Sequence, residues 1–160
     1  MTSLRQRLRH RAGSILPLGA MASLLSMAAL ALRGHAEAGS AAAPFNAVSH
    51  RLRPGRALRL DTAHPRHTAL GAAVHAGSSV FWAAVYDEAV CRRQPPPSPA
   101  GLMAGAAGVA ALAAVADLAL VPAHSAPGDA HRLSQRGRAL TYALFAAGLA
   151  AGGLAARRWR

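Results

Sequence analysis

The sequence predicts an all-α integral membrane protein, a four-span transmembrane helical bundle of short helices rich in Ala and Gly. Three observations predict this class. Four apolar segments have about the length that a helix needs to cross a hydrocarbon core, roughly 20 residues. Arginine-containing connections separate these segments, as membrane topology requires. Of the 160 residues, 42 are Ala and 15 are Gly, which suits close helix packing within a single membrane domain over residues 1–160.

The four predicted spans follow from hydropathy along the chain. They cover residues 14–32, 68–86, 100–121 and 139–156. The first follows the basic stretch RQRLRHR, the third contains one charge, Asp117, and the fourth ends in RRWR, where Arg and Trp suit the headgroup region. Soluble Ala-rich helices are the alternative, because Ala and Gly contribute little apolar area. Arginine at the boundaries of all four segments favours the bilayer.

The N-terminal segment has a second interpretation. A basic start, an apolar run and small residues at 36–38 resemble a secretory signal peptide, whose cleavage would leave three spans. The apolar run is longer than the usual central region of a signal peptide, and Arg33 and His35 interrupt the approach to the cleavage site. The sequence therefore favours a first span that stays in the membrane.

The connection over residues 33–66 is rich in Arg and contains a candidate interfacial helix over residues 44–53. Pro44 suits the first position of a helix. Three apolar residues would then share one face: Phe45, Val48 and Leu52. This pattern is typical of a helix lying in the headgroup region. A solvated Arg-rich loop is the alternative.

Orientation depends on how the arginines divide between the two sides of the membrane. With four crossings, nine Arg lie on the side of both termini and nine on the opposite side, so the totals used by the positive-inside rule are tied. Four Arg precede the first span and only Arg33 closely follows it. This favours both termini in the cytoplasm, with the chain as a multi-pass protein of a bacterial inner membrane.

Composition excludes several function classes. A net charge of +12 indicates nucleic acid in a soluble protein, but here the 18 arginines flank apolar runs and aromatic residues make up only 4% of the chain, so no nucleic-acid partner is expected. The chain has no Lys for a phosphate-binding loop or a Schiff base, and its one Cys, Cys91, allows no internal disulfide. HExxH, GxGxxG and GxSxG do not occur, so we predict no catalytic residue and no metal site.

Glycine spacing indicates how the helices meet. GxxxG patterns occur in the third and fourth spans, and the first of them is extended by one more Gly on the same face. These residues are Gly101, Gly105, Gly108, Gly148 and Gly152. Small residues at this spacing let helix backbones approach closely. We expect the third and fourth spans to pack through these faces, within one chain, in a homo-oligomer or against a membrane protein partner.

Polar residues of the second span follow one face. At 100° per residue, a stripe about 100° wide contains His67, Gly71, His75, Ser78, Trp82 and Tyr86. Such a stripe belongs in the protein interior or a water-filled cavity, because hydrocarbon cannot satisfy polar groups. From depth along the spans, the predicted polar cluster contains His67, His75, Ser78, Asp117 and Tyr142. It can serve as hydrogen bonds between helices or hold a proton between imidazole and carboxylate.

Haem is a common cofactor of four-helix bundles and needs two axial histidines on opposite helices at similar depth. Only the second span carries an intramembrane histidine, His75, with His67 at its edge. Neither haem nor any other cofactor is therefore expected.

The run APFNAVSH (43–50) followed by RHTALGAAVHAGSSVFWAAVYDE (66–88) resembles an uncharacterised family of small bacterial multi-pass integral membrane proteins. The shared pattern is Asn-x-x-Ser-His, then a span reading His-Thr-x-x-Gly-x-x-x-His-x-x-Ser-x-x-Phe-Trp-Ala. The matching positions are Asn46, Ser49, His50, His67, Thr68, Gly71, His75, Ser78, Phe81, Trp82 and Ala83. Arg51 stands where this family has an aromatic residue. The resemblance implies a membrane protein and implies no activity.

These observations lead to a non-enzymatic membrane component that acts through helix packing or through a partner. The alternative function is proton-coupled or small-solute transport through the His/Asp cluster. An intramembrane enzyme is the third and least supported interpretation, because Ser, His and Asp are present without a recognisable motif spacing.

Overall fold

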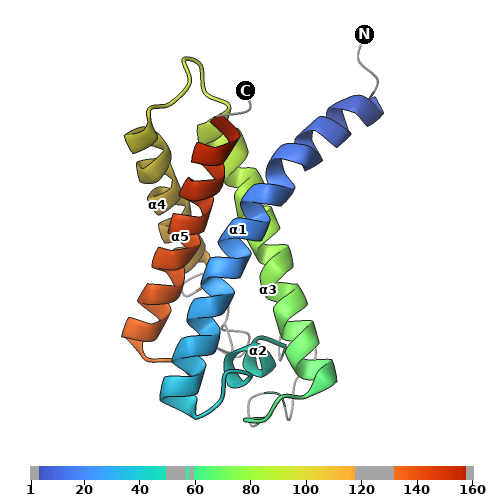
Figure 1. The fold of residues 1–160 in the computed structure, drawn as a ribbon, viewed down its shortest axis with the longest axis vertical. Coiled ribbons are helices and arrows are strands. Elements are labelled where there is room, and N and C mark those ends of the chain that lie inside the picture. Colours follow the sequence, from blue (N-terminus) through green and yellow to red (C-terminus); the bar gives the residue numbers. More distant parts are fainter. Residues whose placement is uncertain (1–3, 50–56, 58–59, 118–131, 158–160) are drawn as a thin grey trace.

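The computed structural model describes residues 4–49, 57, 60–117 and 132–157, and every regular element within these residues is helical. The elements are α1 (Leu4–Ala38), α2 (Ala43–Val48), α3 (Pro65–Tyr86), the π-helical turn η3 (Asp87–Cys91), α4 (Pro99–Val115) and α5 (Gln135–Arg157). In Figure 1 the long helices α1, α3 and α5 follow the long axis of the molecule. Helix α4 packs against α5, and α2 lies at the end where α1 stops and α3 starts.

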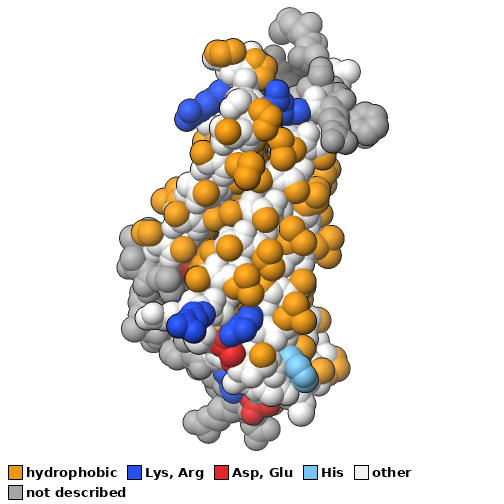
Figure 2. Space-filling model, turned by 60° about the vertical axis from the view of Figure 1, so that its left-hand side comes forward, with side chains coloured by type: hydrophobic (Ala, Val, Ile, Leu, Met, Phe, Trp, Pro, Cys, Tyr) orange, Lys and Arg blue, Asp and Glu red, His pale blue; other side chains and the backbone are white. Residues whose placement is uncertain are grey.

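Within the described residues, three helices are long and apolar enough to cross a membrane, which fits a multi-pass membrane protein. These segments are Arg11–Ala38, Pro65–Cys91 and Gln135–Arg157. Helix α4 is apolar but has only 17 residues, so it falls short of the others. The predicted third span ran to residue 121, and residues 118–121 lie outside the described chain. Figure 2 shows hydrophobic side chains across the middle of one face and arginines toward both of its ends, as a bilayer requires.

Local sequence explains where α3 and α4 begin. Pro65 and Pro99 occupy the first positions of α3 and α4, where the N–H that proline lacks has no helical partner. The side chain of Ser98 caps α4, because its Oγ accepts a hydrogen bond from the Gly101 N–H at 3.0 Å.

The core lies between α1, α4 and α5, closed by the end of α3. Leu18, Leu102 and Leu149 are buried there with Phe145 and Tyr86. The Tyr86 hydroxyl donates to the Leu102 carbonyl oxygen at 2.9 Å, which satisfies its polar atom inside the core. This contact joins the end of α3 to the beginning of α4.

The glycine face of α5 packs against α1. A Cβ atom added at Gly148 would lie 2.5 Å from the Ala22 Cα, and one added at Gly152 would lie 3.1 Å from the Leu18 Cα. The two helix backbones therefore approach closely at these positions. This corrects the expectation that α5 uses this face against the third span, because α1 offers the small residue Ala22 at the crossing.

The glycine face of α4 does not meet α5 within the described chain. A Cβ at Gly105 would contact the Val90 side chain at 2.6 Å, and one at Gly108 would have no neighbour within 4 Å. Gly101 lies near Pro97 and Ser98 of the preceding turn. The face of α4 that is buried carries larger residues, Leu102 and Val109 among them, which remove more apolar area from the surroundings.

The α1–α5 crossing can be tested with Gly148→Ala. The added methyl group would overlap backbone atoms of Ala22, which cannot rotate away, so we expect a loss of roughly 1–3 kcal/mol in the free energy of unfolding in detergent. The matched control is Gly108→Ala, where the space is open and alanine favours the helix by about 0.5–1 kcal/mol. Equal stabilities of the two variants would contradict this packing.

Helix α2 differs from the predicted interfacial helix over residues 44–53. It ends at Val48, and all six of its residues are buried. Glycines on both sides admit it: a Cβ at Gly34 would lie 2.5 Å from the Pro44 ring, and one at Gly71 would lie 1.8 Å from the Phe45 carbonyl oxygen. Helix α2 is therefore wedged between α1 and α3 and presents no polar face to the surroundings. Leu52, expected on its apolar face, lies outside the described residues.

Candidate functional site

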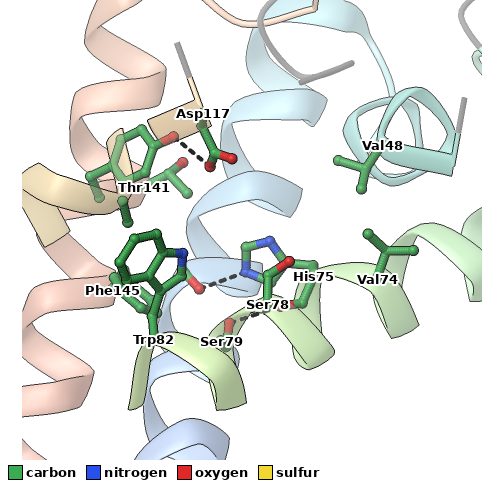
Figure 3. Close-up of a pocket in the computed structure, with 12 residues that line it drawn as sticks. Val48, Val74, His75, Ser78, Ser79, Trp82, Asp117, Thr141 and Phe145 are labelled. Carbon is green, nitrogen blue, oxygen red and sulfur yellow. Dashed lines mark hydrogen bonds between the residues drawn. The ribbon is translucent and has the colours of Figure 1, made fainter. Parts of the chain in front are cut away.

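A half-open cavity of about 70 Å³, mostly apolar but with several polar side chains, lies between α1, α3, α5 and the end of α4, beside Val48 of α2. Figure 3 shows side chains from these elements converging on it. The polar side chains on its wall, beside the aromatic rings of Trp82 and Phe145, are Ser26, His75, Ser78, Ser79, Asp117, Thr141 and Tyr142. Three members of the predicted polar cluster besides His75 are thus found at this cavity, although the sequence predicted no partner from the first span.

Asp117 and Tyr142 form a direct contact across the cavity. The Tyr142 hydroxyl donates to Asp117 Oδ2 at 3.0 Å. Asp117 lies two residues beyond the end of α4, and Tyr142 lies in the second turn of α5. The pair therefore connects two helices while leaving the carboxylate on the cavity wall.

His75 is held by a buried serine of α1. Its Nε2 lies 2.8 Å from Ser26 Oγ, and this oxygen also lies 2.8 Å from the carbonyl oxygen of Ala22. The hydroxyl has one proton. When it donates that proton to Ala22, the imidazole donates its Nε2–H to Ser26, and Nδ1 of the neutral ring is left as an acceptor. In Figure 3 this second ring nitrogen lies on the edge of the imidazole that faces Asp117.

The cavity can hold water between the imidazole and the carboxylate. A single water needs roughly 10–15 Å³ of cavity volume and two to four polar partners. The volume of about 70 Å³ and the hydroxyl groups of Ser78 and Thr141 meet both requirements. A basic nitrogen, a carboxylate and bridging water are the components of a proton relay inside a membrane.

His67 does not join this cavity, which corrects its place in the predicted cluster. Its Nδ1 lies 2.8 Å from Ser49 Oγ, and its ring centroid lies 5.1 Å from that of His64. Helix α2 explains why His67 lies away from the cavity. Ser49 directly follows α2, and its hydroxyl is hydrogen-bonded to the His67 ring. Depth along α3 placed His67 correctly near the end of the helix, but depth alone cannot show an intervening element.

Asn46 organises the second polar group, around α2. Its Nδ2 donates to the carbonyl oxygens of Leu60 at 2.9 Å and Thr62 at 2.8 Å. Its Oδ1 accepts from the Thr68 hydroxyl at 2.6 Å, and that hydroxyl accepts from the His64 N–H at 2.9 Å. The Asn46 side chain of α2 thus holds both the loop before α3 and the first turn of α3.

Most of the residues that carried the family resemblance gain a structural explanation here. Asn46, Ser49, His67, Thr68 and Gly71 all contribute to docking α2 onto α3. Of the remaining positions, His75, Ser78 and Trp82 line the cavity, Ala83 is buried and Phe81 is exposed. His50 lies outside the described residues.

Sequence reasoning missed Ser26, Ser79 and Thr141 at the cavity. Ser26 is fully buried, and the Thr141 hydroxyl donates to the Gly137 carbonyl oxygen at 3.1 Å. A signal for Ser26 existed, since Ser23 and Ser26 are the polar residues in the middle of an apolar span. Among the described residues, no group of three or more His, Cys, Asp or Glu side chains is arranged to hold a metal ion.

The fold and this cavity define the class of protein: a helical bundle with membrane-length helices and a cavity between them that contains titratable side chains. Comparisons with protein-family models, curated proteins and solved structures find no match to the chain. The resemblance drawn from the motif therefore stays a prediction.

Proposed function

We propose that the chain is a small, non-enzymatic, four-span membrane protein that passes protons through the cavity between His75 and Asp117. The path of the chain supports four crossings. In Figure 1 the beginning of α1 and the end of α5 lie at the same end of the bundle. Three long helices alone would leave them at opposite ends, so α4 supplies the remaining crossing. We place both termini on the cytoplasmic side of a bacterial inner membrane, following the arginines before α1.

The observation that carries the proposal is the shared cavity. His75 and Asp117 come from α3 and from the residues after α4, yet they line one space that has room for water. Position along the helix places His75 about 15 Å from the beginning of α3, near the middle of the bundle. Titratable side chains at such depth are expensive in a bilayer and are typical of proton pathways.

The sequence first predicted a membrane component that acts through helix packing. The exposed apolar side chains of α4 are the feature that supports it. Met103, Leu112 and Val115 of α4 are exposed beside Gly108, and such a face could meet another helix. Lipid alone covers an exposed apolar face equally well, so this observation does not distinguish a partner from a bilayer. Lipid contact does not explain why His75 and Asp117 line the same cavity, and we therefore favour proton handling.

The test is proton flux in vesicles that contain the purified chain, with a pH-sensitive dye inside and a potassium gradient as the driving force. We expect flux above that of protein-free vesicles. His75→Ala should lower it by roughly tenfold or more, because His75 is the one histidine among the described residues that line the cavity.

The matched control is His35→Ala, because His35 is an exposed histidine in the last turn of α1. It should leave both flux and folded yield unchanged. If vesicles with the unmodified chain are no more permeable than empty ones, the proposed function is wrong. If His75→Ala lowers only the folded yield, the histidine serves helix packing.

A further inference from the structure

The end of the bundle opposite α2 has a second hollow, of about 440 Å³, between the turn after η3 and the end of α5. Arginines form part of its wall: Arg92 and Arg93 come from the turn and Arg157 from the last turn of α5. Apolar groups form the rest, among them Leu102 and Ala156. No Asp or Glu is among the described residues that line it.

Positive charge exceeds negative charge around this hollow. Arg92 lies 3.9 Å from Asp87 Oδ2 and 3.8 Å from Glu88 Oε2, near the limit for an ion pair. Glu88 also pairs with Arg11 at 3.2 Å. Two carboxylates are thus shared by Arg11 and Arg92, while Arg93 and Arg157 add two further charges at the hollow.

At the other basic end of the bundle, two arginines are paired with acids. Arg33 pairs with Glu37, and Arg132 pairs with Asp61 at 2.6 Å. Glu37 also accepts from the Ser134 N–H at 2.5 Å, which ties the end of α1 to the beginning of α5. The Glu37 carboxylate therefore lies in the wall of the shallow hollow at that end, whereas no carboxylate is among the described residues that line the hollow at Arg93 and Arg157.

We propose that the hollow at Arg92, Arg93 and Arg157 binds the phosphate headgroup of an anionic phospholipid. Guanidinium groups match phosphate oxygens in shape and charge, and basic pockets at the ends of membrane helices hold anionic lipid headgroups. The apolar wall at Leu102 and Ala156 fits the glycerol and the beginning of the acyl chains. The inference needs only that these helices lie in a bilayer and is independent of proton flux.

The experiment is native mass spectrometry of the full chain in detergent, with equal amounts of dioleoylphosphatidylglycerol and dioleoylphosphatidylcholine. We expect one phosphatidylglycerol to be retained in preference to phosphatidylcholine. The double variant Arg93→Gln/Arg157→Gln should weaken this binding by roughly twentyfold, since each arginine near an anionic lipid contributes on the order of fivefold. Ala156→Leu keeps every charge and narrows the hollow, so it should also reduce retention.

Arg66→Gln is the matched control, because Arg66 is an exposed arginine at the other end of α3. It should leave lipid retention unchanged, and all variants should elute as folded protein. Equal retention of the two lipids by the unmodified chain would overturn the proposal. So would displacement of the bound lipid by millimolar inorganic phosphate, because the site would then recognise free phosphate alone.

Discussion

Replacing Gly71 with alanine is expected to dislodge α2 from the bundle and to lower the free energy of unfolding by about 3 kcal/mol or more. The new Cβ would lie 1.8 Å from the Phe45 carbonyl oxygen and 2.6 Å from the carbonyl carbon. Both contacts are with backbone atoms, so no change of rotamer relieves them. The helix must move as a unit, and thermal or denaturant unfolding in detergent micelles measures the loss.

The displacement of α2 would also break the hydrogen bonds that Asn46 makes to Leu60, Thr62 and Thr68. Gly77→Ala in the same helix is the matched control, because nothing lies within 4 Å of the added methyl group. There alanine should raise stability slightly through its helix propensity. Gly71→Ala with the stability of the unmodified chain would show that α2 is not wedged between α1 and α3.

The sequence predicts the long helices of the fold but not the buried position of α2. Long apolar runs are local properties, so α1, α3 and α5 are recognisable from hydropathy alone. The buried position of α2 depends on Gly34 of α1 and Gly71 of α3, which come to lie on either side of α2 only after folding. Hydropathy cannot detect such a site, and Phe45 and Val48 therefore resembled the apolar side of a surface helix.

The candidate site was predicted as far as depth and helix periodicity allow. The stripe on α3 indicated that His75 and Ser78 face inward; both line the cavity, although Ser78 is exposed and the buried serine is Ser79. Depth along the spans placed Asp117 and Tyr142 near them. Periodicity gives the direction of a side chain on its own helix but not the partner across from it. Ser26 of α1 was missed for this reason, and the α5 glycines were paired with α4 in place of α1.

The carboxylate of Asp117 should be needed for proton flux and dispensable for folding, which Asp117→Asn separates. Asparagine has nearly the same shape and keeps an oxygen that accepts from the Tyr142 hydroxyl, so the contact between α5 and the residues after α4 survives. The neutral amide of asparagine, unlike a carboxylate, cannot take up and release a proton. We therefore expect an unchanged folded yield in detergent and a flux lower by roughly tenfold or more, because carboxylates inside the membrane form proton relays.

The control for Asp117→Asn is Glu88→Gln, because the Glu88 carboxylate is exposed and pairs with Arg11 outside the cavity. It should change neither yield nor flux. Asp117→Ala is a useful third variant, since it removes both the charge and the acceptor for Tyr142 and should lower the yield as well. Full flux from Asp117→Asn would contradict a role of the carboxylate in proton transfer. Asp117 would then only connect the end of α4 to α5 through Tyr142, and any proton path would depend on His75 without it.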